Sequence, residues 1–319
     1  MKETSPEAAT APLADAQAWK TWAPWVGAAA VVAWLLSEVP LGEVLAASRE
    51  ASLGWFLSGI LGGVAFWFLL DSLGFSILFT RFNTPFSWAE ARALRGVTYL
   101  LAAINWNVGT AGIILFLQRF KRVPALESTS SILFYSLFDT VALLGMGMTG
   151  ALVLETSAEL ARFELIAGGI IAALALFLLV LVLDEPAWGW LQRVRGWSVF
   201  RTYRAASWRD YVLFLALRLG YFFGFVLVFY FGAAAFGLGV SLPLAMASVP
   251  LILLAGALPI TPGGIGTQAA AMLYFWPEAG ERGAVVALGL LLPFALTGAR
   301  VLLGLPYLTE FRRLNRPTE

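Results

Sequence analysis

The most apolar third of the chain is interrupted by Pro259, Ile260, Thr261, Pro262, Gly263, Gly264, Ile265, Gly266 and Thr267. Two prolines remove backbone donors and three glycines loosen the chain, so a helix must break here. Lipid hydrocarbon cannot satisfy the freed carbonyl and amide groups, so a break at membrane depth is tolerated only where protein or a watery cavity covers it. Broken helices of this kind are where membrane transporters bind their substrates.

The composition is that of a polytopic membrane protein. Of 319 residues, 60% are hydrophobic and only 13% are charged, and no soluble domain of this size needs so much apolar surface. The formal net charge of +1 makes nucleic acid an unexpected partner. Histidine and cysteine are absent, which excludes disulfides, thiolate nucleophiles, histidine bases and the usual zinc, haem and iron–sulfur ligand sets. We therefore expect no metal, no cofactor and no enzymatic activity.

Six apolar stretches are long enough to cross about 30 Å of hydrocarbon, which takes about 20 helical residues. They run from Trp22 to Val39, Leu53 to Thr80, Ser131 to Val153, Glu164 to Leu183, Tyr211 to Ala235 and Glu281 to Pro306. Two further apolar segments are interrupted near their middles. These are Gly96 to Leu117, broken at Asn105 to Gly109, and Ser241 to Trp276, broken at the proline and glycine run.

The distribution of positive charge predicts the topology, because Lys and Arg collect on the cytoplasmic side of short loops. Basic residues flank the first interrupted segment on both sides, and arginines also fill the connection before Tyr211 and the C-terminus. All of them are cytoplasmic if both interrupted segments turn back to the side they entered. The predicted fold is therefore an all-α polytopic membrane protein with six full spans plus two re-entrant helical hairpins. Both termini are expected in the cytoplasm, and the membrane is expected to be the inner membrane of a bacterium.

This topology contains an inverted repeat. The triplet of span, hairpin and span between residues 53 and 153 has the opposite orientation to the triplet between residues 211 and 306, a layout found in many secondary transporters. Residues 1–21 are expected to form a disordered cytoplasmic tail, residues 22–309 a single transmembrane domain, and residues 310–319 a second cytoplasmic tail.

The two hairpin tips are the predicted substrate-binding site. At each tip a Gly–Thr pair precedes an apolar run, so Thr110 and Thr267 are candidate N-caps that aim a helix N-terminus at the membrane interior. Such an end carries about half a positive charge and free N–H groups, which suits a phosphate or carboxylate. Alternatively, these polar residues only cap and pack the hairpins. The candidate residues are Asn105, Asn107, Gly109, Thr110, Thr261, Gly263, Gly264, Gly266, Thr267 and Gln268.

Four ionisable residues fall inside the predicted spans, namely Asp71, Asp139, Arg218 and Arg300. A charge at a helix centre costs about 2.5 to 3.5 kcal/mol on insertion scales, so each should face the bundle or water and be paired. The inverted repeat relates Asp71 to Arg218 and Asp139 to Arg300, which predicts a neutral intramembrane cluster of two ion pairs. A static buried salt bridge, or arginines that snorkel to the interface, is the alternative interpretation.

Two GxxxG spacings, Gly59 with Gly63 and Gly220 with Gly224, predict close packing of the helices that carry them.

Two motifs resemble those of a known family. The run Leu258, Pro259, Ile260, Thr261, Pro262, Gly263, Gly264, Ile265, Gly266 is similar to the C-terminal signature of the lysylphosphatidylglycerol synthase transmembrane-region family, and Phe134, Tyr135, Ser136, Leu137, Phe138, Asp139 resembles its central motif. That family includes the flippase half of the multiple peptide resistance factors. For a standalone member without the aminoacyl-transferase domain, the resemblance implies an integral membrane protein that moves or gates lipids.

The chain departs from the family pattern at two places. Family members commonly carry a Glu shortly after the Pro–Gly–Gly stretch, where this chain has Ala269, and a Gly–Glu in the first broken segment, where it has Gly112 and Ile113. The missing acids favour a neutral or anionic headgroup over an aminoacyl-phospholipid.

These observations predict a flippase-like or scramblase-like transporter that moves lipid or lipid-linked headgroups between leaflets, with membrane lipids as partners. The sequence contains no Walker motif, so movement would be downhill or coupled to an ion or the membrane potential. One alternative is a non-transporting membrane scaffold or subunit whose helix breaks are purely architectural. Another is an intramembrane lipid-modifying enzyme, although no evident acid–base set is present.

Overall fold

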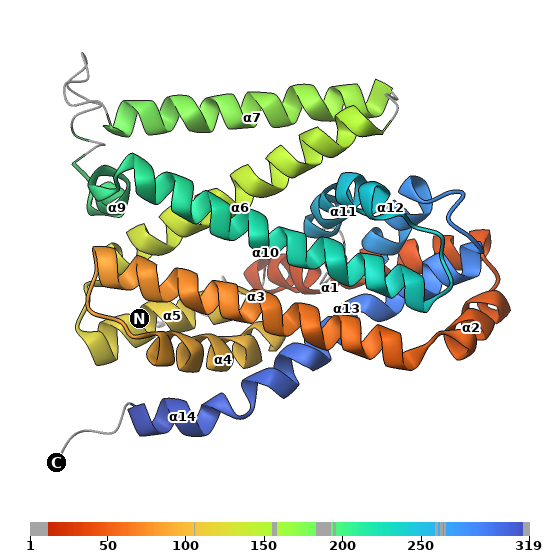
Figure 1. Cartoon of the computed structure of the whole chain (residues 1–319), viewed down its shortest axis with the longest axis horizontal. Coiled ribbons are helices and arrows are strands. Elements are labelled where there is room, and N and C mark those ends of the chain that lie inside the picture. The colour runs from red at the N-terminus through yellow and green to blue at the C-terminus, as the bar shows by residue number, and fades with distance from the viewer. Residues whose placement is uncertain are drawn as a thin grey trace, which may run out of the picture.

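The computed structural model describes residues 12–104, 106–154, 158–182, 193, 196–258, 261, 264 and 266–314. Side chains are described within these ranges from Trp25 onward, except at 103–107, 158–161, 163, 182 and 314. Every regular element within these ranges is helical (Figure 1). The elements are α1 Pro12–Glu38, α2 Leu41–Glu50, α3 Leu53–Phe82, α4 Trp88–Ile104, α5 Trp106–Lys121, α6 Ala125–Val153, α7 Ala158–Val182, the short 3₁₀ turn Ser198–Phe200, α9 Arg201–Ala205, α10 Trp208–Ala235, α11 Leu242–Ala257, α12 Thr267–Phe275, α13 Arg282–Gly304 and α14 Tyr307–Leu314.

Five helical segments in the described part of the chain are long and apolar enough to cross a membrane. They are Leu53–Phe82, Ala125–Val153, Glu164–Leu181, Trp208–Ala235 and Arg282–Arg313, and the bent pair Trp25–Glu38 and Leu41–Glu50 adds a sixth if it counts as one span. The protein is therefore a multi-pass helical membrane protein.

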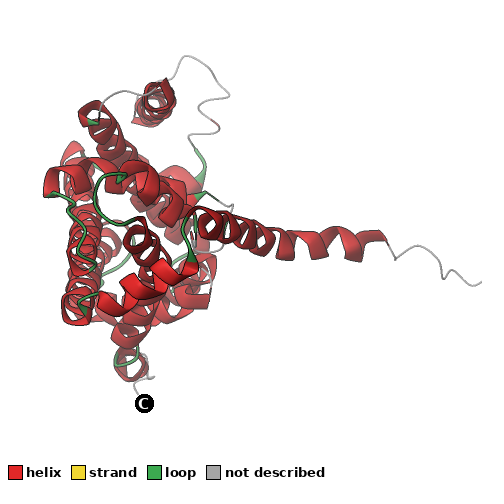
Figure 2. Ribbon diagram, turned by 90° about the vertical axis from the view of Figure 1, so that its right-hand side faces the viewer, coloured by secondary structure: helices red, strands yellow, loops and turns green. Residues whose placement is uncertain are grey.

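The first predicted span, Trp22 to Val39, corresponds to the second half of α1, and the chain bends sharply where this helix ends. α1 and α2 meet at a bend of 87°. The bend lies at Pro40, the N-cap of α2, because a proline disfavours helical geometry in the residue before it. The N-terminal half of α1 projects away from the other helices (Figure 2). α1 begins at Pro12, inside the segment expected to be a disordered tail, and α14 carries helix beyond residue 310 at the other end.

Both interrupted segments are pairs of helices that fold back on each other, α4 with α5 and α11 with α12. α4 and α5 lie beside one end of the long helices, and α11 and α12 lie nearer the opposite end (Figure 1). The second pair is joined through the proline and glycine run, where Gly264 and Gly266 have φ of 73° and 88°. Residues other than glycine rarely adopt such angles, which explains why the helix stops there.

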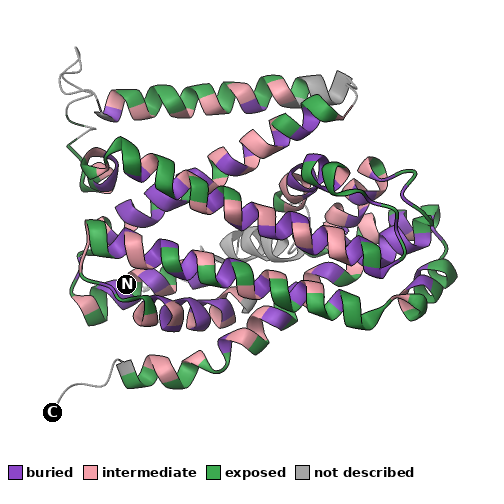
Figure 3. Cartoon of the chain, in the orientation of Figure 1, coloured by how far each residue is buried: buried purple, intermediate pink, exposed green. Residues whose placement is uncertain are grey.

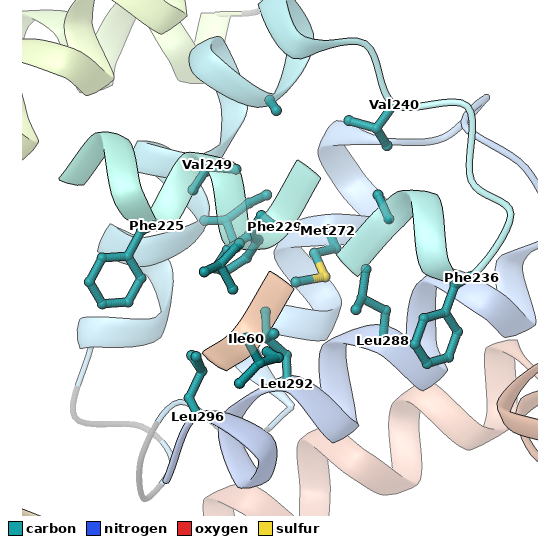
Figure 4. Packing of buried hydrophobic residues seen from close by; sticks show 14 of the residues in the cluster. Ile60, Phe225, Phe229, Phe236, Val240, Val249, Met272, Leu288, Leu292 and Leu296 are labelled. Carbon is teal, nitrogen blue, oxygen red and sulfur yellow. The ribbon is translucent and has the colours of Figure 1, made fainter. Parts of the chain in front are cut away.

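The long helices pack around a hydrophobic core formed mainly by α3, α10 and α13. Ile60, Phe229, Met272, Leu288 and Leu292 converge in this core (Figure 4), whereas α7 lies at the edge of the bundle with most of its surface exposed (Figure 3). An exposed apolar helix is what lipid contact requires.

The interface between α3 and α10 depends on the two glycine pairs. A Cβ at Gly63 would overlap the side chain of Val228, and one at Gly224 would stand 2.9 Å from Phe66. The close packing predicted from the GxxxG spacings is confirmed.

Candidate functional site

A network of buried charges joins four helices. Asp71 on α3 accepts hydrogen bonds from Arg95 on α4 and Arg218 on α10. Arg218 also donates to Asp139 on α6. The side chains of Asp71, Arg95 and Arg218 are at most 8% exposed, whereas that of Asp139 is 33% exposed. The network is therefore closed at Asp71 and accessible at Asp139.

Helix geometry explains why Asp71 meets Arg218. α3 and α10 run in opposite directions, and each residue lies about 26 Å from the same end of the pair at about 1.5 Å per residue. The two side chains are thus at equal depth. Aromatic residues complete their surroundings, because the Tyr135 hydroxyl donates to Asp71 at 3.3 Å and the Arg218 guanidinium lies 4.1 Å from the centre of the Tyr221 ring.

Three of the four predicted cluster residues, Asp71, Asp139 and Arg218, are brought together. The fourth, Arg300 on α13, lies next to them without joining the ion pairs. Its guanidinium stands 5.7 Å from the ring centre of Trp67 and 6.0 Å from that of Tyr99. The cluster therefore does not consist of two separate ion pairs as expected, because Arg218 on α10 pairs with both Asp71 and Asp139.

Arg95 is a member of the network that the sequence analysis missed. Its position beside basic loop residues led to its interpretation as a cytoplasmic topology signal. α4 buries Ala91, Leu94, Arg95 and Thr98 on one face, with the spacing i, i+3, i+4 and i+7. This helical periodicity was the available signal, because it places Arg95 on the apolar face of α4.

The second tip is closed by hydrogen bonds within the turn. The Thr267 hydroxyl donates to the Gly264 carbonyl at 3.1 Å and lies 3.2 Å from the Thr261 hydroxyl. Gly266 is the N-cap of α12, so Thr267 is the first helical residue and not the predicted cap. Its hydroxyl is used as a donor to a carbonyl group instead of as an acceptor for a helix amide.

Gln268 fills the space behind this turn. Its side-chain amide lies against Gly256 and Gly264, where a Cβ would stand 2.6 Å and 3.1 Å from its Nε2 atom. The Oε1 atom of Gln268 is buried and has no hydrogen-bond partner among the described residues. Val31 of α1 packs against Gly266, so α1 covers the outer side of the tip.

The first tip is described in part. Asn105 and Gly263, one candidate from each tip, lie outside the described residues, and for Asn107 only the helical backbone is described. α5 starts at Trp106, so Thr110 lies inside the helix and is not its N-cap. Gly109 allows close contact with α4, because a Cβ there would stand 3.1 Å from the Thr98 carbonyl oxygen.

The structure explains why a small residue stands at position 269. Ala269 is fully buried, and a Cβ at Gly289 of α13 would stand 2.5 Å from Ala269. A longer side chain at either position would push α12 away from α13.

Two apolar grooves open on the flank of the bundle. The larger, of about 620 Å³, lies between α6, α10 and α11 and is lined by Met146, Gly150, Leu219, Phe223 and Ala247, among others. Leu219, which lines this groove, directly follows Arg218 of the charge network on α10. A second groove of about 410 Å³ lies between α6, α7, α11 and α12. Both have the apolar lining that an acyl chain requires.

The model of the family described as the lysylphosphatidylglycerol synthase TM region matches residues 21–304, which include both helix pairs and the whole charge network. No curated protein matches the chain. The extent of the family match shows that the chain is a member of the lysylphosphatidylglycerol synthase transmembrane-region family.

Proposed function

We propose that this protein moves the polar headgroup of a lipid between the leaflets of a bacterial cytoplasmic membrane. The headgroup passes through a polar cleft at the two hairpin tips while the acyl chains stay in the apolar grooves and the surrounding lipid. Membership of a family of lipid-related membrane domains is the observation that carries this proposal.

The packing pattern supports an inverted repeat of two units, α3 to α6 and α10 to α13. The first helices of the two units, α3 and α10, pack against each other. The first hairpin helix of each unit packs against the last helix of the other unit, α4 on α13 and α11 on α6. Each hairpin also contacts helices of its own unit. Exchanging the two units leaves this pattern unchanged. We infer six spans with two re-entrant hairpins that enter from opposite sides, and with both termini in the cytoplasm.

Close glycine contacts repeat in the two units. A Cβ at Gly150 on α6 would overlap the backbone of Ala247 on α11, and a Cβ at Gly304 on α13 would stand 2.6 Å from the Gly96 carbonyl oxygen on α4. In each case a glycine near the end of the last helix of one unit receives the hairpin of the other. Each hairpin is therefore supported by the opposite unit, as expected if the two units rock against each other during transport.

The charge network crosses the boundary between the units. Asp71, Arg95 and Asp139 belong to the first unit and Arg218 to the second. Such a network holds the units in one relative position, and its exposed carboxylate at Asp139 is the point where water or a headgroup reaches it. A network that is buried but accessible at one carboxylate can break and re-form as the two units move, so it suits a contact that opens during transport better than one that is permanent.

The cargo that fits best is an anionic or neutral phospholipid or lipid-linked headgroup. Ala269 stands where an acid would attract a cationic headgroup, and the close contact with Gly289 leaves no space for one. We propose transport without catalysis and without a bound cofactor.

Reconstitution into liposomes tests this function. Fluorescent phospholipid in the inner leaflet is protected from dithionite, so a transporter increases the fraction that is reduced. The wild-type protein is expected to increase this fraction, and Gly264→Val and Gly266→Val are expected to abolish the increase because both positions need positive φ. Gly145→Val, at a position with open space around it, is the matched control and should transport normally.

The outcomes separate the candidate functions. Equal reduction in liposomes with and without the wild-type protein would favour the non-transporting scaffold. Normal transport by folded Gly264→Val and Gly266→Val would show that the second tip is not on the path.

A further inference from the structure

Arg300 is the cation near the network that has no matching acid. No described carboxylate lies within ion-pair distance of its guanidinium, whereas Arg95 and Arg218 share Asp71, and Arg218 also bonds Asp139. Three arginines and two aspartates leave one positive charge in excess, and it is located on Arg300. An uncompensated charge within a membrane bundle is costly, so its retention calls for a counter-ion.

The two aromatic residues beside Arg300 carry unused hydrogen-bond donors. Trp67 and Tyr99 are at most 1% exposed, and the indole Nε1 of Trp67 and the hydroxyl of Tyr99 have no partner among the described residues. Buried Trp and Tyr normally place these groups against an acceptor. These residues are also the ones over whose rings the Arg300 guanidinium lies.

The acids near these donors are already occupied. The charged and titratable groups that act on the Tyr99 hydroxyl are Arg95, Asp71, Tyr221 and Arg300, and the only acid among them, Asp71, is bonded to two arginines. The surroundings of Tyr99 and Arg300 are therefore rich in donors and poor in acceptors.

Packing separates this place from the cytoplasmic end of the bundle. The rings of Phe68 and Tyr99 lie 5.6 Å apart, and the ring of Tyr307 lies 5.1 Å from that of Phe68. On this side of the site, α4 and α13 also contact each other at Gly96 and Gly304. Arg300 itself is half-buried. A ligand would thus reach the two buried donors past the Arg300 guanidinium.

We propose that Arg300, Trp67 and Tyr99 form an anion site that binds one phosphate group. The guanidinium fork offers two parallel donors suited to phosphate oxygens, and the indole and phenol supply two more from helices α3 and α4. A phosphate diester carries a single negative charge, which matches the excess. This site is separate from the proposed path at the tips, and its test measures binding instead of movement.

The test uses the full chain purified in a non-ionic detergent and titrated calorimetrically with dioctanoyl-phosphatidylglycerol. One binding site is expected in the wild type. Arg300→Gln should weaken binding at least tenfold, Tyr99→Phe and Trp67→Phe should weaken it several-fold, and Arg300→Lys should recover part of the loss. Arg92→Gln is the matched control, because Arg92 also lies over a tryptophan ring, at 4.7 Å from Trp88, and it lies outside the site.

Two further titrations distinguish the sources of the phosphate. Displacement of the lipid by inorganic phosphate shows that the site takes the phosphate group from any carrier, whereas binding of the lipid alone shows a headgroup site. Dioctanoylglycerol, which has the tails but no phosphate, should not compete. Competition by dioctanoylglycerol, equal binding by wild type and Arg300→Gln, or an equal loss in Arg92→Gln would overturn the proposal.

A measurement without ligand checks the same idea. Because the excess charge is uncompensated when the site is empty, Arg300→Met should raise the melting temperature of the lipid-free protein by at least about 2 °C. Phosphatidylglycerol should then stabilise the wild type and leave Arg300→Met unchanged. A lower melting temperature for lipid-free Arg300→Met would mean that the arginine is a structural partner of the aromatic rings and would contradict the proposal.

Discussion

Arg218 on α10 binds Asp71 on α3 and Asp139 on α6 with the two ends of one guanidinium group. This single side chain therefore connects three long helices that are far apart in the sequence. Since Asp71 is buried and Asp139 is partly exposed, substitutions of these two aspartates should differ in how much they lower stability.

Removing Arg218 should be strongly destabilising. Arg218→Gln removes the arginine that pairs with Asp139 and leaves Arg95 as the only described cation on Asp71. Breaking a buried ion pair typically costs about 3 to 5 kcal/mol. Unfolding in detergent, followed by circular dichroism, measures the change. Asp139→Asn should cost less than Asp71→Asn, because Asp139 is the exposed end. The combined Asp71→Asn and Arg218→Gln variant should lose less than the sum of its parts, and strict additivity would contradict the coupling.

Replacing either of the two glycines that contact the opposite unit, Gly150 and Gly304, with a larger residue should destabilise the protein to a similar degree. Gly150→Val and Gly304→Val each force a side chain into a backbone, and overpacking typically costs about 1 to 3 kcal/mol. Gly145→Val on α6 and Gly298→Val on α13 have open space and serve as matched controls. Melting temperatures of the four variants provide the comparison. Destabilisation of only one of the two contact variants would contradict the inference that each hairpin is supported by a close glycine contact with the opposite unit.

Restoring the acid common in the family should not be tolerated in this chain. Ala269→Glu buries a carboxylate against Gly289 with no described cation beside it, so folding should be lost or severely reduced. Fluorescence-detected size-exclusion chromatography of the expressed variant measures the folded fraction. Ala269→Ser, with nearly the same size and no charge, should remain folded. A monodisperse peak from Ala269→Glu would show that α12 can move away from α13.

The first hairpin should weaken in acid through Glu90. The Ser87 backbone and hydroxyl donate to this carboxylate at 2.8 Å and 2.9 Å, and Lys121 at the end of α5 binds it too. Burial alone raises the pKa of Glu90, but the bonds from Lys121 and Ser87 outweigh it and hold the pKa below its ordinary value of 4.5. A carboxyl whose pKa falls on folding stabilises the fold above its unfolded pKa and loses that contribution as the pH drops through the folded value.

Glu90→Gln should therefore lower stability by about 1 kcal/mol at pH 7, the usual value of a helix cap. The difference between variant and wild type should shrink as the pH falls below 4.5. Melting curves between neutral and acidic pH measure this, and a difference independent of pH would argue against a role for the charge.

Local features of the sequence predicted much of the fold. The long apolar stretches correspond to α3, α6, α7, α10 and α13, and both interrupted segments are helix pairs that break where proline, glycine and asparagine gather. The cap residues were misplaced, because Gly266 with positive φ ends the turn and leaves Thr267 inside the helix. The choice between two adjacent residues depends on backbone angles that the order of residues does not specify.

By itself, the sequence determined that this is a multi-pass helical protein with two interrupted segments, because hydrophobic length and helix breaking are properties of consecutive residues. Only the tertiary structure decided which charges meet. Arg95 entered the network and Arg300 stayed beside it because the relative depth and rotation of α4, α10 and α13 place one guanidinium on Asp71 and the other over two aromatic rings. Such placement follows from how helices pack against each other, and the close glycine contacts that set it join residues far apart in the chain.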